Sequence, residues 1–144
     1  MATIKLEVVS PDQVVYANDI AMLIVRSTAG ELGILPRHAP LVTGLIPHAM
    51  RIKLPGDSEE LLLAVSGGFM EVTPEKITVL ASGAEEPSTI DVNRAQKAYQ
   101  RAKERIAAFH QGSPPEKDFD VKRAELALQR AKARLMAAKI HFDE

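Results

Sequence analysis

The spacing of apolar residues changes once along this chain, near residue 85, and that change limits the folds open to it. Before that point apolar and polar residues alternate in short runs, as Ile4, Leu6 and Val8 do with Lys5 and Glu7. Alternation with period two places the apolar side chains on one face of an extended strand. Turns rich in Pro and Gly separate the runs, as is typical of all-β domains. Residues 1–84 are therefore predicted to form a β-sandwich of about ten short strands.

The second part of the chain has helical spacing. Asp91 and Asp120 each precede an apolar run, where a carboxylate can accept the free N–H groups of a first helical turn. A short loop joins the two runs, and helices so joined pack antiparallel. Residues 85–144 are predicted to form a two-helix hairpin with a hinge at 85–90. The apolar positions advance by alternate steps of three and four, as in a coiled-coil seam: Val92, Ala95, Tyr99, Ala102, Ile106 and Phe109, then Val121, Ala124, Leu128, Ala131, Leu135 and Ala138.

Composition excludes several classes of function. The 144 residues contain no cysteine, which excludes disulfides, thiolate zinc sites and a Cys nucleophile. No phosphate loop, dinucleotide-binding fingerprint, zinc-protease motif or nucleophile elbow is present, so the chain is predicted to be non-catalytic. Residues 88–144 carry twelve Lys or Arg against eight Asp or Glu, but they contain no nucleic-acid-binding motif, and the pI is about 6.4. Nucleic acid is therefore not an expected partner.

Four arginines on the predicted hairpin are candidates for an anion site. Antiparallel packing about the loop places Arg101 near the level of Arg130, and Arg94 near Arg134. Like charges repel unless they are solvated or share an anion, and the guanidinium fork matches phosphate oxygens. The alternative is that these are ordinary exposed arginines of amphipathic helices, and spacing alone does not decide between the two.

The predicted helical seam is rich in alanine. Five of its twelve positions are alanine, which buries much less apolar surface than Leu or Val. We therefore expect a hairpin that is strongly helical but weakly packed. Such an element can leave its resting position, as a switch must.

Residues 30–41 are predicted to form a loop whose glycines and prolines fix its shape. This loop displays Glu31, Arg37 and His38. Rigid polar loops on a β scaffold commonly bind a partner, although an ordered connection without a partner explains the same pattern. A zinc site using His38 and His48 is disfavoured because no motif supplies the remaining ligands.

Four segments of the sequence stand out together: Val8-Val9-Ser10-Pro11, residues 30–41, Val65-Ser66-Gly67-Gly68-Phe69 and Ala124-Glu125-Leu126-Ala127-Leu128. In this order they resemble the epsilon subunit of bacterial F-type ATP synthases, and the resemblance covers essentially the whole chain. It implies a β-sandwich on the central stalk that contacts the gamma subunit and the membrane c ring. It also implies a hairpin that either folds onto the sandwich or extends into the alpha and beta subunits, where it blocks ATP hydrolysis. Such a subunit lies on the cytoplasmic face of the cell membrane and contacts it only through the complex.

The resemblance also implies roles for particular residues. Glu31 and His38 are candidates for contact with the c ring and the gamma subunit. Some family members bind ATP in the folded-down form through a motif that residues 90–95 match. ATP is then a regulatory ligand, with the need for Mg²⁺ left open. By resemblance, the phosphates contact Arg94, Arg101, Arg130 and Arg134, the nucleoside has Glu85 and Asp91 at its polar edges, and Ile90 gives apolar contact.

One departure from the family pattern concerns the loop between the helices. Residues 111–119 include two prolines and form a longer loop than is usual in this family. A stand-alone ATP-binding sensor and a small enzyme remain as alternatives to the regulatory subunit.

Overall fold

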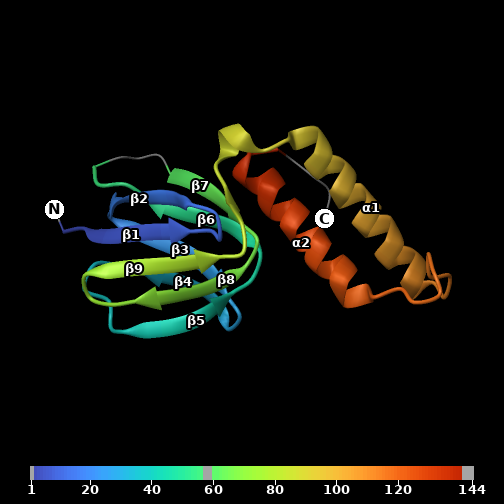
Figure 1. Ribbon diagram of the computed structural model, residues 1–144, viewed down its shortest axis with the longest axis horizontal. Helices are drawn as coiled ribbons and strands as arrows, with labels where there is room; N and C mark the ends of the chain where they lie inside the picture. The colour runs from blue at the N-terminus through green and yellow to red at the C-terminus, as the bar shows by residue number, and fades with distance from the viewer. Residues whose placement is uncertain (1, 57–59, 141–144) are drawn as a thin grey trace.

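The computed structural model describes residues 2–56 and 60–140, and it confirms a β-sandwich followed by an antiparallel helical hairpin (Figure 1). The hairpin lies along one side of the sandwich, with α2 (Val121–Ala137) next to the strands and α1 (Val92–His110) outermost. The ten strands are β1 (Ile4–Val9), β2 (Val14–Ile20), β3 (Met22–Ser27), β4 (Gly30–Ile34), β5 (Leu41–Leu45), β6 (His48–Lys53), β7 (Glu60–Val65), β8 (Gly68–Val72), β9 (Lys76–Ala81) and β10 (Ala84–Glu85).

The strands pair in the order β10-β7-β6-β3-β5-β8-β9-β1-β2, with β4 paired to β3. All the pairs are antiparallel except β1 with β9. Alternation in β1 works as predicted, since Ile4, Leu6 and Val8 are at most 1% exposed. The interior is aliphatic, so its stability comes from many branched side chains rather than from a few aromatic anchors.

The apolar run at residues 20–25, which its continuous hydrophobicity would assign to one buried strand, is divided between two strands. β2 ends at Ile20 and β3 begins at Met22, with a break at Ala21. The Ala21 N–H donates to the carbonyl of Lys53 at 2.8 Å. At this break the chain changes its pairing partner from β1 to β6. Both sides of the break are apolar, so hydrophobicity gave no sign of the change.

Residues 30–34 are a strand rather than part of a loop, which corrects the prediction for residues 30–41. β4 pairs with β3 in register from Ser27 opposite Gly30 to Leu23 opposite Ile34. The Ser27 hydroxyl closes the intervening turn, accepting from the Ala29 N–H at 3.1 Å and donating to the Gly30 carbonyl at 2.7 Å. The two glycines in the segment masked the strand pattern.

Gly68 permits the close approach of β8 to β9. Its φ is +143°, and a Cβ there would clash with the Leu80 carbonyl oxygen and lie 2.9 Å from the Ala81 Cα. Only glycine tolerates both the backbone angle and the contact.

The helical seam forms largely as predicted. Ala95, Tyr99, Ala131 and Leu135 make its buried centre. Phe109, expected at the end of the seam, is 37% exposed and contacts the ring of Phe119 from the connecting loop. Within the described residues, neither helix is long and apolar enough to cross a membrane.

Both predicted N-caps are present. The Asp91 carboxylate accepts the Arg94 N–H at 3.0 Å, and the Asp120 carboxylate accepts the Arg123 N–H at 3.2 Å. The repeated Asp thus marks the first turn of each helix and sets where the helix begins.

Replacing Asp120 with alanine is expected to destabilise the hairpin by about 1 kcal/mol, because a backbone donor of α2 loses its acceptor. Thermal unfolding followed by helical circular dichroism measures the loss. Asp118→Ala is the control, since it removes the same charge two residues before the cap. Equal effects of the two substitutions would contradict the capping role.

Candidate functional site

The helix α2 has a second buried face, directed at the sandwich. Ala133 and Ala137 are 2% and 1% exposed, although neither belongs to the seam with α1. Ala137 packs against Ala64 of β7 and Ile90 of the connector, and α2 lies on β6 and β7 (Figure 1). Small side chains let the helix approach the sheet closely, so the hairpin rests on the sandwich largely through alanine contacts.

The connector between the two parts of the chain is anchored in this conformation. Its first residues form β10, in which Glu85 pairs with Ala64 of β7. A 3₁₀ turn follows at Pro87–Thr89. Ile90 is 8% exposed, in contact with Ala64 and Ala137. The predicted hinge is therefore held by backbone pairing and by one apolar side chain, and it sets the position of Asp91 at the start of α1.

An ion pair joins the connector to the second helix. The Arg134 Nε donates to Glu85 Oε1 at 2.7 Å, and both side chains are about one third exposed, at 35% and 33%. Glu85 belongs to the sheet through its backbone, so this pair also ties α2 to the sandwich. Two of the predicted site residues, far apart in the sequence, are thus in direct contact.

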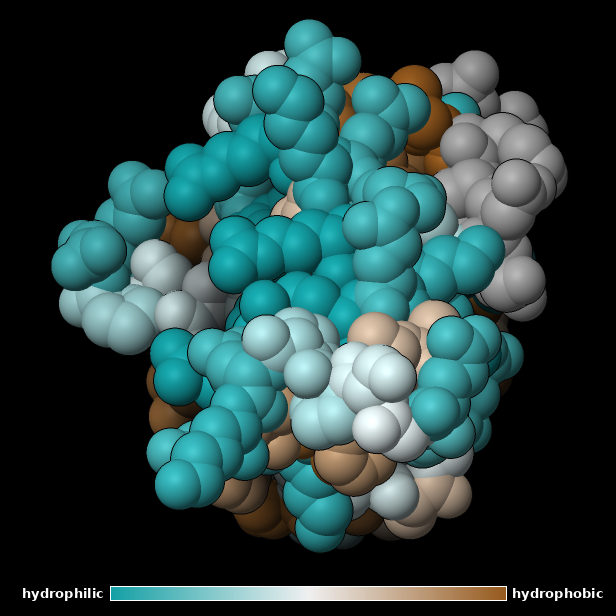
Figure 2. All heavy atoms as spheres, turned by 90° about the vertical axis from the view of Figure 1, so that its right-hand side faces the viewer, coloured by the Kyte–Doolittle hydropathy of each residue, from teal (hydrophilic) through white to brown (hydrophobic). Residues whose placement is uncertain are grey.

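A hollow of about 480 Å³ lies between the helices towards their connecting loop. Its volume is within the roughly 300–1,000 Å³ typical of small-molecule sites. We call it the arginine hollow, because four arginines from both helices line it: Arg101, Arg105, Arg123 and Arg130. Seen from the hairpin side, hydrophilic side chains cover most of the surface (Figure 2).

The four arginines named from the sequence are not gathered into one cluster in this conformation. Arg101 and Arg130 share the arginine hollow, Arg134 is paired with Glu85, and Arg94 is exposed near the start of α1. Along the helix axes, Arg94 lies about 10 Å from Arg101, at about 1.5 Å per residue. An extended nucleoside triphosphate is long enough to contact both groups at once.

Two arginines of the hollow escaped notice in the sequence. Arg105 lies four residues after Arg101, and Arg123 lies seven residues before Arg130, so each shares a helical face with a named residue. That spacing could have predicted that both arginines line the hollow. The loop residues Glu116 and Phe119 also line it, but no sequence pattern predicts this, because their placement depends on how the loop folds back.

Glu31 and His38 lie on different parts of the sandwich. Glu31 is near the start of β4, 3.6 Å from Arg26, and both side chains are 58% exposed. His38 lies beyond the end of β4, and its Nδ1 is 2.7 Å from the Ala39 carbonyl oxygen. The three residue steps from Glu31 to Ile34 alone span about 10 Å. The two side chains therefore lie apart on the sandwich.

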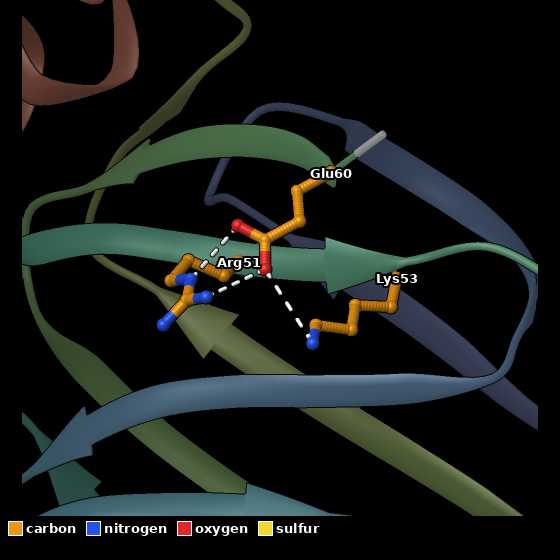
Figure 3. Close-up of polar contacts among 3 residues, drawn as sticks. All are labelled: Arg51, Lys53 and Glu60. Atoms are coloured by element: carbon orange, nitrogen blue, oxygen red, sulfur yellow. Dashed lines mark hydrogen bonds and ion pairs between the residues drawn. The ribbon is translucent and has the colours of Figure 1, made fainter. Parts of the chain in front are cut away.

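A second hollow, of about 390 Å³, separates Glu31 and Arg51 on the sandwich from Lys132 and Met136 on α2. Arg51 is also bound to Glu60 through two hydrogen bonds, 2.8 Å from Nε and 2.6 Å from Nη2 (Figure 3). Lys53 lies 3.8 Å from the same carboxylate. The hydrogen bonds from Arg51 lower the pKa of Glu60.

This pair predicts a small pH-dependent stability term. A carboxyl group with a lowered folded pKa stabilises the fold above its unfolded pKa, and the contribution disappears as pH falls through the folded value. Because the pair is largely solvated, we expect a coupling energy of about 0.2–1 kcal/mol at neutral pH and none in acid. A double-mutant cycle with Arg51→Ala and Glu60→Gln measures it. Coupling that persists in acid would rule out the ionic origin.

An apolar patch faces outward from β5, β8 and β9. It consists of Val42, Phe69 and Leu80, which are 71%, 63% and 58% exposed. Phe69 lies opposite Leu80 and opposite Gly44, and Val42 shares a face with Gly44 two residues along β5. Three large apolar side chains on one sheet face mark a surface suited to a partner.

The histidines considered for zinc do not form a metal site. His48 is buried, its Nδ1 donates to the Ile46 carbonyl at 2.6 Å, and burial lowers its pKa. Across residues 2–56 and 60–140, no three His, Cys, Asp or Glu side chains are grouped to hold a metal ion.

Comparison with known proteins accounts for the whole described fold. The family model described as the beta-sandwich domain of the ATP synthase delta/epsilon chain matches residues 3–87. The model described as the long alpha-helix domain of the same chain matches residues 88–139.

Individual relatives agree with these matches. An ATP synthase epsilon chain from Alkalihalophilus pseudofirmus is 54% identical over 74% of this chain and 78% of its own length. One from Bacillus subtilis is 49% identical over 74% and 79%. Among solved structures, a chain of the Euglena gracilis mitochondrial ATP synthase shares the fold with a TM-score of 0.77 at 23% identity, covering 96% of this chain and 82% of that one.

Proposed function

This chain belongs to the ATP synthase delta/epsilon family, whose epsilon chains are non-catalytic subunits of the central stalk of F-type synthases. From that premise, we propose that the chain inhibits ATP hydrolysis through its hairpin and senses ATP with the same hairpin. In the extended form the hairpin enters the ring of alpha and beta subunits. In the closed form it lies on the sandwich and binds ATP.

The sandwich attaches the subunit to the rest of the stalk. The apolar patch of Val42, Phe69 and Leu80 is proposed to contact the gamma subunit, because burying it removes exposed apolar area from water. His38 belongs to the same attachment, and Glu31 is assigned to the c ring. The subunit is then peripheral, on the cytoplasmic face of the cell membrane, and reaches the membrane only through the complex.

Replacing Phe69 with alanine is expected to weaken the affinity for the gamma subunit about tenfold, because a large aromatic contact of roughly 1.4 kcal/mol is lost. Co-purification or calorimetry with the gamma subunit measures the change. Leu126→Ala is the matched control, since Leu126 is 46% exposed on α2, which lies on β6 and β7 rather than on the strands of the apolar patch. Unchanged affinity for Phe69→Ala would exclude this surface.

The observation that carries the ATP proposal is the arginine hollow, where Arg101 of one helix and Arg130 of the other face the same space. This arrangement exists only while the helices lie side by side. A polyanion bound there stabilises the closed hairpin, since it neutralises the repulsion between the arginines. Arg94 and Arg134 are proposed to bind or orient the remaining phosphates, with Ile90, Asp91 and Glu85 near the nucleoside.

Neither the contact that holds the hairpin closed nor the binding of a ligand involves a large free energy. The hairpin rests on the sandwich largely through alanine side chains, each of which contributes less on burial than a Val or Leu side chain. A ligand at a hundred times its dissociation constant stabilises the form that binds it by about 2.7 kcal/mol. A change of this size is enough to shift the population of a weakly held element.

Titration of the isolated chain with ATP, with and without Mg²⁺, tests the sensing role. Saturable binding of ATP that protects the hairpin from proteolysis supports it, and absence of binding would refute it. Binding to the gamma subunit distinguishes a synthase subunit from a stand-alone sensor, because only a synthase subunit should bind gamma tightly without nucleotide. Release of phosphate from ATP by the isolated chain would instead revive a small enzyme.

A further inference from the structure

The loop between the helices folds back onto α1 and forms one wall of the arginine hollow. The Phe119 ring lies 5.2 Å from the guanidinium carbon of Arg105 and 5.6 Å from the ring of Phe109. The Arg105 Nη2 donates a hydrogen bond to the Glu116 carboxylate. One arginine of the hollow thus has an aromatic and an ionic contact with the loop.

Arginines outnumber carboxylates in the lining of the hollow, and the carboxylates differ in the groups that they bind. Four arginines face three carboxylates, those of Glu116, Asp118 and Asp120. Asp120 is committed to the cap of α2. Glu116 differs, because its carboxylate already binds a guanidinium of the hollow, where a phosphate oxygen would bind.

We propose that the arginine hollow is a polyphosphate site to which Arg105 and Arg123 belong, and that Glu116 is its built-in competitor. Glu116 holds Arg105 while the site is empty and gives way when a phosphate group enters. The inference rests on the proposed function in one respect, since the polyphosphate is taken to be that of ATP. It extends that function by assigning a regulatory role to the loop.

The exposure of the pair suits a competitor rather than a permanent block. The Arg105 and Glu116 side chains are 30% and 56% exposed. Exposed ion pairs are weak and break readily. A phosphate group matches the guanidinium fork as a carboxylate does, and it offers more negative charge. Glu116 is thus expected to set the affinity of the hollow without abolishing binding.

Glu116→Gln tests this role, because glutamine keeps the size and loses the charge. We expect the variant to bind both ATP and inorganic pyrophosphate about fivefold more tightly at low ionic strength, the factor that corresponds to a strong exposed ion pair. Glu104→Gln is the matched control. Glu104 accepts a hydrogen bond from Gln100 on α1 and does not line the hollow. Circular dichroism verifies that both variants keep their helices.

The outcomes separate the inference from the proposed function. A gain for Glu116→Gln that exceeds the gain for Glu104→Gln, and that shrinks in high salt, supports competition. Equal affinities for the two variants overturn it. If pyrophosphate binds with the expected ratio but ATP does not bind, the ATP proposal fails while the competitor role stands. If neither ligand binds to any of the proteins, both fail.

Discussion

Replacing Arg130 with alanine is expected to weaken ATP binding about 10- to 100-fold. Arg130 lines the arginine hollow opposite Arg101, so one truncation removes a guanidinium at the centre of the proposed phosphate site. A hydrogen bond to a charged group contributes about 1.5–3 kcal/mol, and each 1.4 kcal/mol is a factor of ten in affinity. Calorimetric titration of the isolated chain measures the loss.

The design of that experiment separates charge from geometry. Arg130→Lys keeps the charge but loses the planar fork, so we expect an intermediate affinity. Lys122→Ala removes one positive charge from an exposed position of α2 that does not line the hollow, and it should change little. If Arg130→Ala bound ATP as tightly as the wild-type chain, the phosphate site would have to lie elsewhere.

Replacing Ala137 with glutamate is expected to release the hairpin from the sandwich. Ala137 is 1% exposed, packs against Ala64 and Ile90, and does not line the second hollow. An unpaired charge there must be desolvated, at a cost of several kcal/mol, which exceeds what contacts between small side chains supply. The chain avoids this cost by opening. Distance measurements between fluorophores on the sandwich and on α2 should report the extended form, and the reconstituted synthase should hydrolyse ATP more slowly.

Leu126→Glu is the control for this experiment. Leu126 lies on α2 and is 46% exposed, so the same charge can be introduced there without burial. The sandwich should keep its own stability in both variants, because its core is separate from the hairpin contact. If the hairpin of Ala137→Glu stayed closed, the contact of α2 with the sandwich would not be what holds it.

Much of the fold followed from local patterns. Alternation in β1, the repeated Asp before each helix and the three-four spacing of the seam all predicted what the structure contains. These features depend on contacts between near neighbours in the sequence. The strand at residues 30–34 was not recognised, because its glycines carry no pattern and its partner is β3.

The candidate site was predictable only in part, and the particular residues show why. The spacing of Arg101 and Arg130 about the loop indicated that they would meet, and they line one hollow. Arg134 was expected beside Arg94, yet it pairs with Glu85, 49 positions away in the sequence. Glu85 reaches it because β10 adds to the edge of the sheet at β7. No helical spacing contains that information.

The sequence by itself determined the two kinds of element, where each helix begins and which faces are apolar, because period, capping and turn chemistry act over a few residues. Only the tertiary structure decided that α2 has a second buried face at Ala133 and Ala137, and that the Glu116 carboxylate accepts a hydrogen bond from Arg105. An alanine looks the same in sequence whether it faces water or a sheet, and a loop carboxylate finds its partner only after the chain has closed. The physical reason is that both contacts join segments whose distance is set by packing of the whole chain.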